Sequence, residues 1–170
     1  MEIRERLVAA IQGAVRTLRE TNSDLCGFAL CTDDDVRTLY HVACTREWVR
    51  EKEKDYPDIG FLCVEWTLTA DNAAFDAISR EFDRLADEPD SDPRDWSEAR
   101  DRRFELLVLA LADCRSKGTF SSDVFVCAAS TDPSDHLEKL TMKAVDALNA
   151  RALADGFARA FGYQRHKGRY

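Results

Sequence analysis

Glycine, proline and long apolar runs are all scarce in this chain. It has 7 glycines and 4 prolines in 170 residues, and it lacks the glycine-rich loop that cradles phosphate groups, which argues against nucleotide binding. No apolar run approaches the roughly 18 residues that a membrane-spanning helix needs. The first residues, MEIRERLVAAIQGAV, contain two glutamates and lead directly into Arg16, so they lack the core of a secretory signal. We therefore expect a soluble cytoplasmic protein with no membrane partner.

The signatures of metal centres and hydrolytic sites are also missing. There is no CxxC or HExxH, and Asp33–Asp35 lacks the alternating acids and central glycine of a calcium loop. In a strand, His41 and Cys44 point to opposite faces and cannot share a metal ion. Ser134–His136 contains the residue types of a hydrolytic triad, but Ser and Asp are also the residues expected where a helix begins. We therefore predict no metal site, no cofactor and no catalytic residues.

Six cysteines raise the question of a disulfide framework. Without a secretory signal, a reducing compartment favours free thiols. A thiol inside an apolar run behaves as a small hydrophobic side chain. Five cysteines lie in apolar strand-like runs and the last lies in an apolar helical run: Cys26, Cys31, Cys44, Cys63, Cys127 and Cys114. We expect free thiols that pack in the interior.

Acidic residues outnumber basic ones, and the excess is unevenly distributed. The chain has 32 Asp and Glu against 24 Lys and Arg, a net charge of −8. Residues 151–170 hold five bases and one acid, so the remainder carries 19 bases and 31 acids. This balance disfavours nucleic acids and anionic membranes and favours a basic protein partner. Acidity that serves only solubility is the alternative interpretation.

The stretch from Leu25 to Cys44 predicts a central hairpin. Two apolar runs with a period of two flank an acidic turn at Thr32–Asp35. Neither run has a polar face, which is typical of strands covered on both sides. We therefore place this hairpin at the centre of a sheet.

The remaining apolar patterns predict further strands and helices around this hairpin. Apolar runs predict strands over 61–66 and 124–129, and helical spacing predicts helices over 2–20, 71–85, 97–116, 135–149 and 152–161. The predicted fold is a single α+β domain over 1–170, with a mainly antiparallel sheet of four or more strands, about five helices and a short basic tail at 164–170.

Three tryptophans have acidic neighbours, a pairing that suits contact with an arginine-rich partner. Trp48 follows Glu47, Trp66 follows Glu65, and Trp96 follows Asp95. Tryptophans that close the edge of the core are the alternative, which we favour for Trp66.

Four short segments together resemble a known family. They are FALCTDDD at 28–35, ACTREW at 43–48, VEW at 64–66 and AVDALNA at 144–150. On these segments the chain resembles the DUF4303 family, a bacterial domain of unknown function, over nearly its whole length. The resemblance implies no established catalytic activity. Its acidic, cytoplasmic character is similar to that of antidote (immunity) proteins, which occlude the active sites of bacterial toxins.

Two main hypotheses follow, with a structural or oligomerising module as a third. The first is a non-catalytic domain that binds a basic, toxin-like protein, and its predicted contact residues are Asp33, Asp34, Asp35, Trp48, Glu65 and Trp66. The second is a small enzyme whose cleft contains Tyr40, His41 and Glu65, because burial within an apolar run would raise the pKa of Glu65. A pocket in which Glu65 and His41 converge would favour the enzyme. The oligomeric state stays open.

Overall fold

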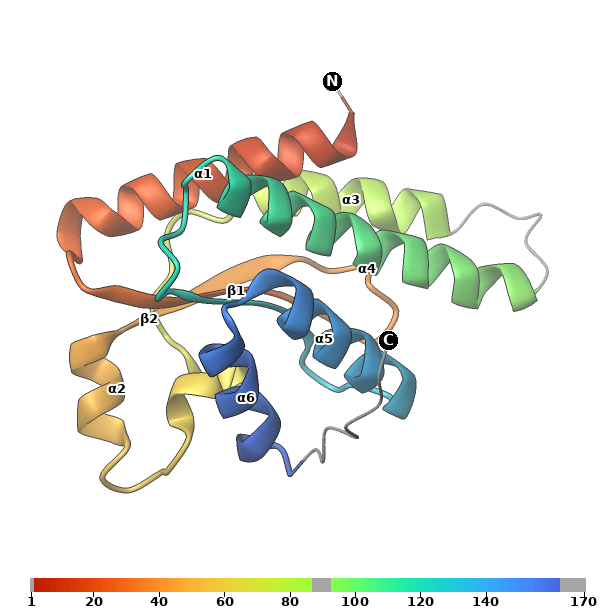
Figure 1. The fold of residues 1–170 in the computed structure, drawn as a ribbon. Coiled ribbons are helices and arrows are strands. Elements are labelled where there is room, and N and C mark those ends of the chain that lie inside the picture. The colour runs from red at the N-terminus through yellow and green to blue at the C-terminus, as the bar shows by residue number, and fades with distance from the viewer. Residues whose placement is uncertain (1, 87–92, 163–170) are drawn as a thin grey trace.

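The computed structural model describes residues 2–86 and 93–162, and it shows an α+β fold in which helices cover both faces of a small sheet (Figure 1). In chain order the elements are α1 (Ile3–Thr21), β1 (Leu25–Thr32), β2 (Tyr40–Thr45), α2 (Arg46–Lys52), the 3-10 turns η1 (Ile59–Phe61) and η2 (Cys63–Glu65), α3 (Ala73–Ala86), α4 (Pro93–Ser116), β3 (Phe125–Ser130), α5 (Asp135–Leu148) and α6 (Arg151–Ala160). The described residues thus form six α-helices rather than about five, because the segment after Thr45 is a helix of its own. The basic tail predicted at 164–170 lies outside the described residues. No helix in the described part of the chain is long and apolar enough to cross a membrane.

The sheet has the strand order β2-β1-β3. The predicted hairpin is confirmed, because β1 and β2 pair antiparallel with Phe28 opposite Ala43. β3 runs parallel to β1, with Val126 opposite Phe28. The sheet is therefore mixed, and the prediction of a mainly antiparallel sheet is wrong. The reason is that the chain reaches β3 through a long crossover that contains α3 and α4, and such connections join parallel strands.

The segment 61–66 is not the strand that its apolar run predicts. It lies instead in the two consecutive 3-10 turns η1 and η2. With about three residues per turn, Cys63 and Trp66 fall on the same side. Both are buried, whereas Val64 and Glu65 between them are exposed. The described residues therefore form three strands, not four or more.

The two faces of the sheet carry separate hydrophobic clusters. α1, α3 and α4 pack on one face, around Phe28, Leu30 and Val126. The η turns and α6 pack on the other, around Trp66 and Phe125. Consecutive strand residues therefore belong to different layers of the molecule, which decides which candidate site residues can meet.

β3 is an edge strand, although its apolar run predicts an interior one and all its residues are buried. α5 packs along it, and Asn149 at the end of α5 occupies its outer edge. The Asn149 side chain accepts a hydrogen bond from Val126 N at 2.8 Å and donates one to Val126 O at 2.7 Å. An amide side chain thus takes the place of a neighbouring strand.

Capping residues bound the helices near the site. Thr45 Oγ1 accepts from Trp48 N at 3.2 Å where α2 begins, and Ser134 Oγ accepts from Leu137 N at 3.4 Å where α5 begins. α4 ends before Gly118, whose φ of 74° is left-handed and favours glycine. The Ser134 cap places the start of α5 directly after the carboxyl end of β3.

Candidate functional site

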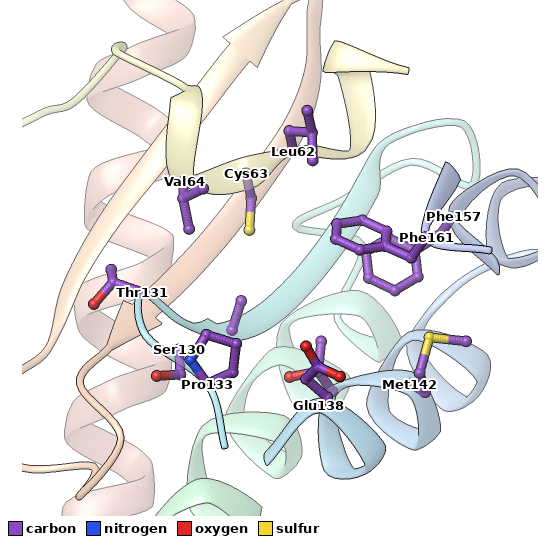
Figure 2. A pocket seen from close by; sticks show the side chains of 12 residues that line it. Leu62, Cys63, Val64, Ser130, Thr131, Pro133, Glu138, Met142, Phe157 and Phe161 are labelled. Atoms are coloured by element: carbon purple, nitrogen blue, oxygen red, sulfur yellow. The ribbon is translucent and has the colours of Figure 1, made fainter. Parts of the chain in front are cut away.

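A cavity of about 180 Å³ lies at the carboxyl end of β3, between η2, α5 and α6 (Figure 2). Its apolar walls are Leu62, Cys63, Val64, Ala129, Pro133, Met142, Phe157 and Phe161, and its polar lining residues are Ser130, Thr131, Glu138 and Thr141. Val64 is 46% exposed and Phe161 is 43% exposed. The cavity therefore opens to solvent through an apolar rim.

A glycine sets the position of α6, which supplies two aromatic walls of the cavity. A Cβ on Gly156 would lie 2.5 Å from Phe61 Cζ, so only glycine lets α6 approach η1 this closely. Phe157 and Phe161 then lie one above the other, with ring centroids 4.5 Å apart. The close helix contact thus holds both rings over the cavity.

The cavity is suited to hold an apolar group rather than to perform acid–base or nucleophilic chemistry. Contact with the Cys127 thiol and burial raise the pKa of Cys63 well above its usual value. Its thiol, which points into the cavity in Figure 2, is therefore protonated and a poor nucleophile. Glu138 is the one charged residue among the described lining residues, and it is exposed.

Acidic residues adjoin the lining of the cavity in the sequence. Glu65 directly follows Val64, and Asp132 lies between Thr131 and Pro133 in the lining. Both carboxylates are exposed. Together with Glu138, which lines the cavity, they give three exposed carboxylates on or directly beside residues of the lining. We refer to this feature, defined by the cavity with Glu65, Asp132 and Glu138, as the acidic groove.

The predicted acidic turn is tied down by its own side chains. Asp33 Oδ1 accepts from Arg37 N at 2.9 Å, and Asp33 Oδ2 accepts from Thr38 N at 3.0 Å and from Thr38 Oγ1 at 2.7 Å. Partial burial favours a higher pKa for Asp33, but these hydrogen bonds outweigh it and lower the pKa below its usual value. Asp33 therefore acts as the organising anion of the β1–β2 connection.

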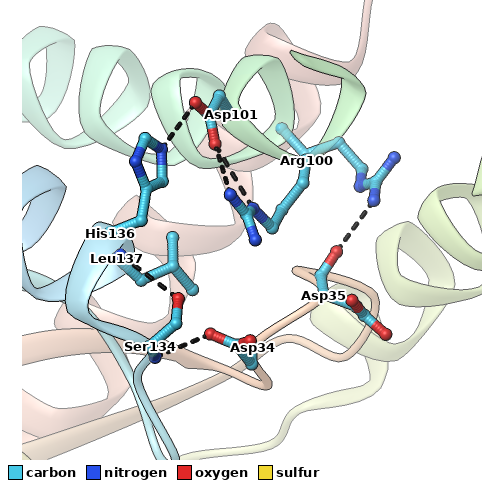
Figure 3. Close-up of polar contacts among 8 residues, drawn as sticks. Asp34, Asp35, Arg100, Asp101, Ser134, His136 and Leu137 are labelled. Carbon is cyan, nitrogen blue, oxygen red and sulfur yellow. Dashed lines mark hydrogen bonds and ion pairs between the residues drawn. The ribbon is translucent and has the colours of Figure 1, made fainter. Parts of the chain in front are cut away.

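The other two aspartates link this turn to neighbouring helices (Figure 3). Asp34 Oδ1 accepts from Ser134 N at 2.9 Å, which ties the turn to the start of α5. Arg103 of α4 donates to the backbone oxygens of Asp35 at 2.8 Å and Val36 at 3.1 Å, and the Asp35 side chain is exposed. Among the described residues, no three His, Cys, Asp or Glu side chains come together in a way that could hold a metal ion.

Ser134 and His136 do not cooperate as triad residues would. Ser134 caps α5, as described above. His136 Nε2 lies 2.7 Å from Asp101 Oδ2 of α4. In Figure 3 the imidazole of His136 thus pairs with Asp101 and not with the hydroxyl of Ser134. The interpretation of Ser134 as a helix cap is confirmed.

The three tryptophans have different surroundings. Trp66 is 3% exposed, and its Nε1 donates to Ile59 O at 3.2 Å, so its ring belongs to the core. Trp48 is half-buried against the same cluster. Trp96 is 61% exposed. The side chain of its acidic neighbour, Asp95, lies outside the described part of the chain. Of the predicted contact residues, Trp66 is thus the one that no partner can reach without opening the fold.

The residues of the proposed enzymatic cleft do not converge. His41 is fully buried between Phe28 and Phe75 on the face covered by α1, α3 and α4. Glu65 is exposed and belongs to η2 on the opposite face. Tyr40, the neighbour of His41, points away from it into the second cluster. The sheet itself therefore separates His41 from Glu65.

Sequence reasoning missed most of the groove lining. Met142, Phe157 and Phe161 form no motif, and their spacing is that of ordinary helix core residues. Gly156 was the available signal, because a glycine inside a helical pattern often marks a close approach. What it approaches could not be known before α6 was placed against η1.

Comparison with known proteins supports the resemblance noted in the sequence. A family model, described as domain of unknown function DUF4303, matches residues 7–150. This span contains all three strands and ends just after Asn149, whereas α6 lies beyond it. No curated protein and no solved structure matches the chain. The chain belongs to the DUF4303 family, whose function is unknown.

Proposed function

We propose that this protein is a non-catalytic binding domain that captures a basic segment of a partner protein in the acidic groove. One apolar side chain of the partner fills the cavity, and neighbouring Lys or Arg side chains contact the carboxylates at its rim. The observation that carries the proposal is an open apolar cavity. Among its described lining residues one is charged, and that residue, Glu138, is negative. Consistent with an antidote role, the partner class that we propose is a basic bacterial toxin.

The size of the cavity favours a side chain over a cofactor. At about 180 Å³ it is smaller than the roughly 300–1,000 Å³ of typical small-molecule sites. It exceeds the roughly 150 Å³ of an engineered cavity that binds benzene. A single aromatic or branched side chain therefore fits, and its burial is the kind of anchor that dominates protein interfaces.

The charges supply steering rather than most of the affinity. Glu65, Asp132 and Glu138 are exposed, so salt screens their attraction to a basic partner. Such rim charges mainly raise the association rate. We therefore expect salt to weaken binding, and we expect only a blocked cavity to abolish it.

The test is affinity capture from the native host, identification of the captured protein, and titration of the purified pair at low and moderate salt. Val64→Arg places a charged side chain at the apolar opening and should weaken binding at least tenfold. Leu85→Arg is the matched control, since Leu85 is an exposed leucine on α3, 40% accessible, and should leave binding unchanged. An acidic partner, or a basic partner equally affected by both variants, would contradict the proposal.

A further inference from the structure

Two cysteines meet at an irregularity in the β1–β2 ladder. The register shifts between Leu25 and Gly27, and Gly27 is the residue that pairs with Cys44. Cys26 is therefore the extra residue of a β-bulge, and two residues of β1 lie opposite one of β2. The Sγ atoms of Cys26 and Cys44 are 3.7 Å apart.

The surrounding residues hold the Cys44 sulfur against β1. A Cβ on Gly27 would lie 2.6 Å from Cys44 Sγ and 2.5 Å from the Trp66 ring. Only glycine leaves room at this position for both groups, so the bulge, Gly27 and Trp66 together define where the sulfur lies. An S–S bond is about 2.0 Å long, so the two sulfurs need to approach by less than about 2 Å.

The two thiols differ in access and acidity. Cys26 is partly exposed, whereas Cys44 is 2% exposed. The hydrogen bond with Cys44 and the positive charge of Arg46 lower the pKa of Cys26, and burial and the charges of Asp24 and Glu53 only partly oppose this effect. The same contact and burial raise the pKa of Cys44. Cys26 is thus the more accessible and more acidic of the two thiols, as an attacking thiol should be, and Cys44 lies within 3.7 Å to resolve the product.

We propose that Cys26 and Cys44 form a redox-sensitive pair that hydroperoxides convert to an intramolecular disulfide. The Cys26 thiolate attacks the peroxide oxygen, the O–O bond breaks, and Cys26 becomes a sulfenic acid as an alcohol or water leaves. Cys44 sulfur then attacks the Cys26 sulfur, and its proton and the sulfenic hydroxyl leave as water. Two thiols are oxidised by two electrons and one hydroperoxide is reduced. This pair is independent of the binding proposed for the acidic groove.

The other cysteines are expected to be unreactive. Cys31, Cys63, Cys114 and Cys127 are buried. A hydrogen bond with Cys63 and burial raise the pKa of Cys31, and burial raises the pKa of Cys114 to about 11. Burial therefore shields all four thiols from a hydroperoxide, and the raised pKa values keep the thiols of Cys31 and Cys114 protonated.

The experiment treats the full chain with hydrogen peroxide and measures the intact mass before the remaining thiols are alkylated for digestion. We expect a loss of about 2 Da, the mass of two hydrogens. Trypsin should then release peptide 20–37 linked to peptide 38–46, which contain Cys26 with Cys31 and Cys44, respectively. The same link in a Cys31→Ala variant assigns it to Cys26.

Variants distinguish the roles of the two thiols. Cys26→Ser should slow peroxide consumption at least tenfold, and Cys44→Ser should accumulate a sulfenic acid that a 1,3-diketone reagent traps. Cys114→Ser, which removes a buried helical thiol, should oxidise like the wild type, and circular dichroism verifies that each variant is folded. A missing disulfide in the wild type, or the same mass loss in folded Cys26→Ser, would overturn the proposal.

Discussion

Asn149 shows how one side chain can complete a sheet. Its amide nitrogen donates to Val126 O and, at 3.0 Å, to Val145 O, while its oxygen accepts from Val126 N and, at 3.3 Å, from Arg115 Nη2. Val126 is fully buried, so no water can replace these bonds. Asn149 also lies within the AVDALNA segment, 144–150, of the family resemblance, which gives that segment a structural role.

Asn149→Asp should lower the free energy of unfolding by about 1–3 kcal/mol. A carboxylate still accepts from Val126 N but cannot donate, which leaves the buried Val126 carbonyl unpaired at a cost of about 1–3 kcal/mol, whereas the Arg115 guanidinium beside it compensates the added negative charge. Asn22→Asp is the matched control, because Asn22 bonds a helix-end carbonyl, Leu18 O, near solvent. Urea unfolding measures both, and equal losses would show that the edge bonds to β3 carry no special weight.

At the scale of elements, the contact between α6 and η1 builds the acidic groove. Phe61 of η1 lies edge-on to Phe125 of β3 and to Phe157 of α6, at centroid distances of 5.2 and 6.4 Å. Gly156 is the point of closest approach between the two elements. The groove therefore depends on one glycine in the middle of a helix.

Glycine-to-alanine substitutions in two helices should have effects of opposite sign. Gly13→Ala in α1 meets nothing within 4 Å and should stabilise the protein by about 0.5–1 kcal/mol, because alanine is the better helix former. Gly156→Ala has the same helical gain but displaces Phe61, and overpacking of this kind costs about 1–3 kcal/mol. Thermal or urea unfolding of the Gly13→Ala and Gly156→Ala variants measures both changes in stability. Stabilisation by both would mean that α6 can move freely away from η1.

The sheet and its two faces also explain how the whole molecule should respond to pH. Burial lowers the pKa of His41, and the hydrogen bond to Asn72 and the charge of Asp71 only partly oppose this effect. Its neutral ring accepts from Ala70 N at 2.9 Å through Nε2, and its Nδ1 lies 2.7 Å from Asn72 Oδ1. Below about pH 6.5, unfolded His41 binds a proton that folded His41 does not. Stability is therefore lost as the pH falls from about 6.5 towards the folded-state pKa, with a slope of at most about 1.4 kcal/mol per pH unit.

His41→Gln should reveal this contribution as a pH-dependent stability difference. At pH 8 the variant should be less stable than the wild type by about 1–3 kcal/mol, because buried hydrogen bonds are lost. At pH 5 the difference should be smaller, because glutamine cannot take up the proton that destabilises the folded wild type. Phe82→Leu is the control, because Phe82 is fully buried and has no titrating group. Its difference in stability from the wild type should be the same at both pH values. A His41→Gln difference that grows on acidification would refute the assignment.

The sequence predicted the elements whose signals are local. The β1–β2 hairpin and the helix cap at Ser134 are confirmed because each depends on residues close together in the chain. The segment 61–66 misled because a short apolar run has the same composition in a strand and in turns that bury every third residue. The parallel pairing of Phe28 with Val126 joins segments nearly 100 residues apart, and no local pattern records such a partner.

The sequence by itself determined the α+β class, the two apolar strands at 25–44, the family resemblance and the acidic surface, because each follows from composition or short-range periodicity. Only the tertiary structure decided that His41 and Glu65 lie on opposite faces, that Asn149 closes β3, and that Cys26 meets Cys44. It also decided that α6 completes an apolar groove at the end of β3. The physical reason is that a site depends on which faces of distant elements meet, and that is set by packing of the whole core.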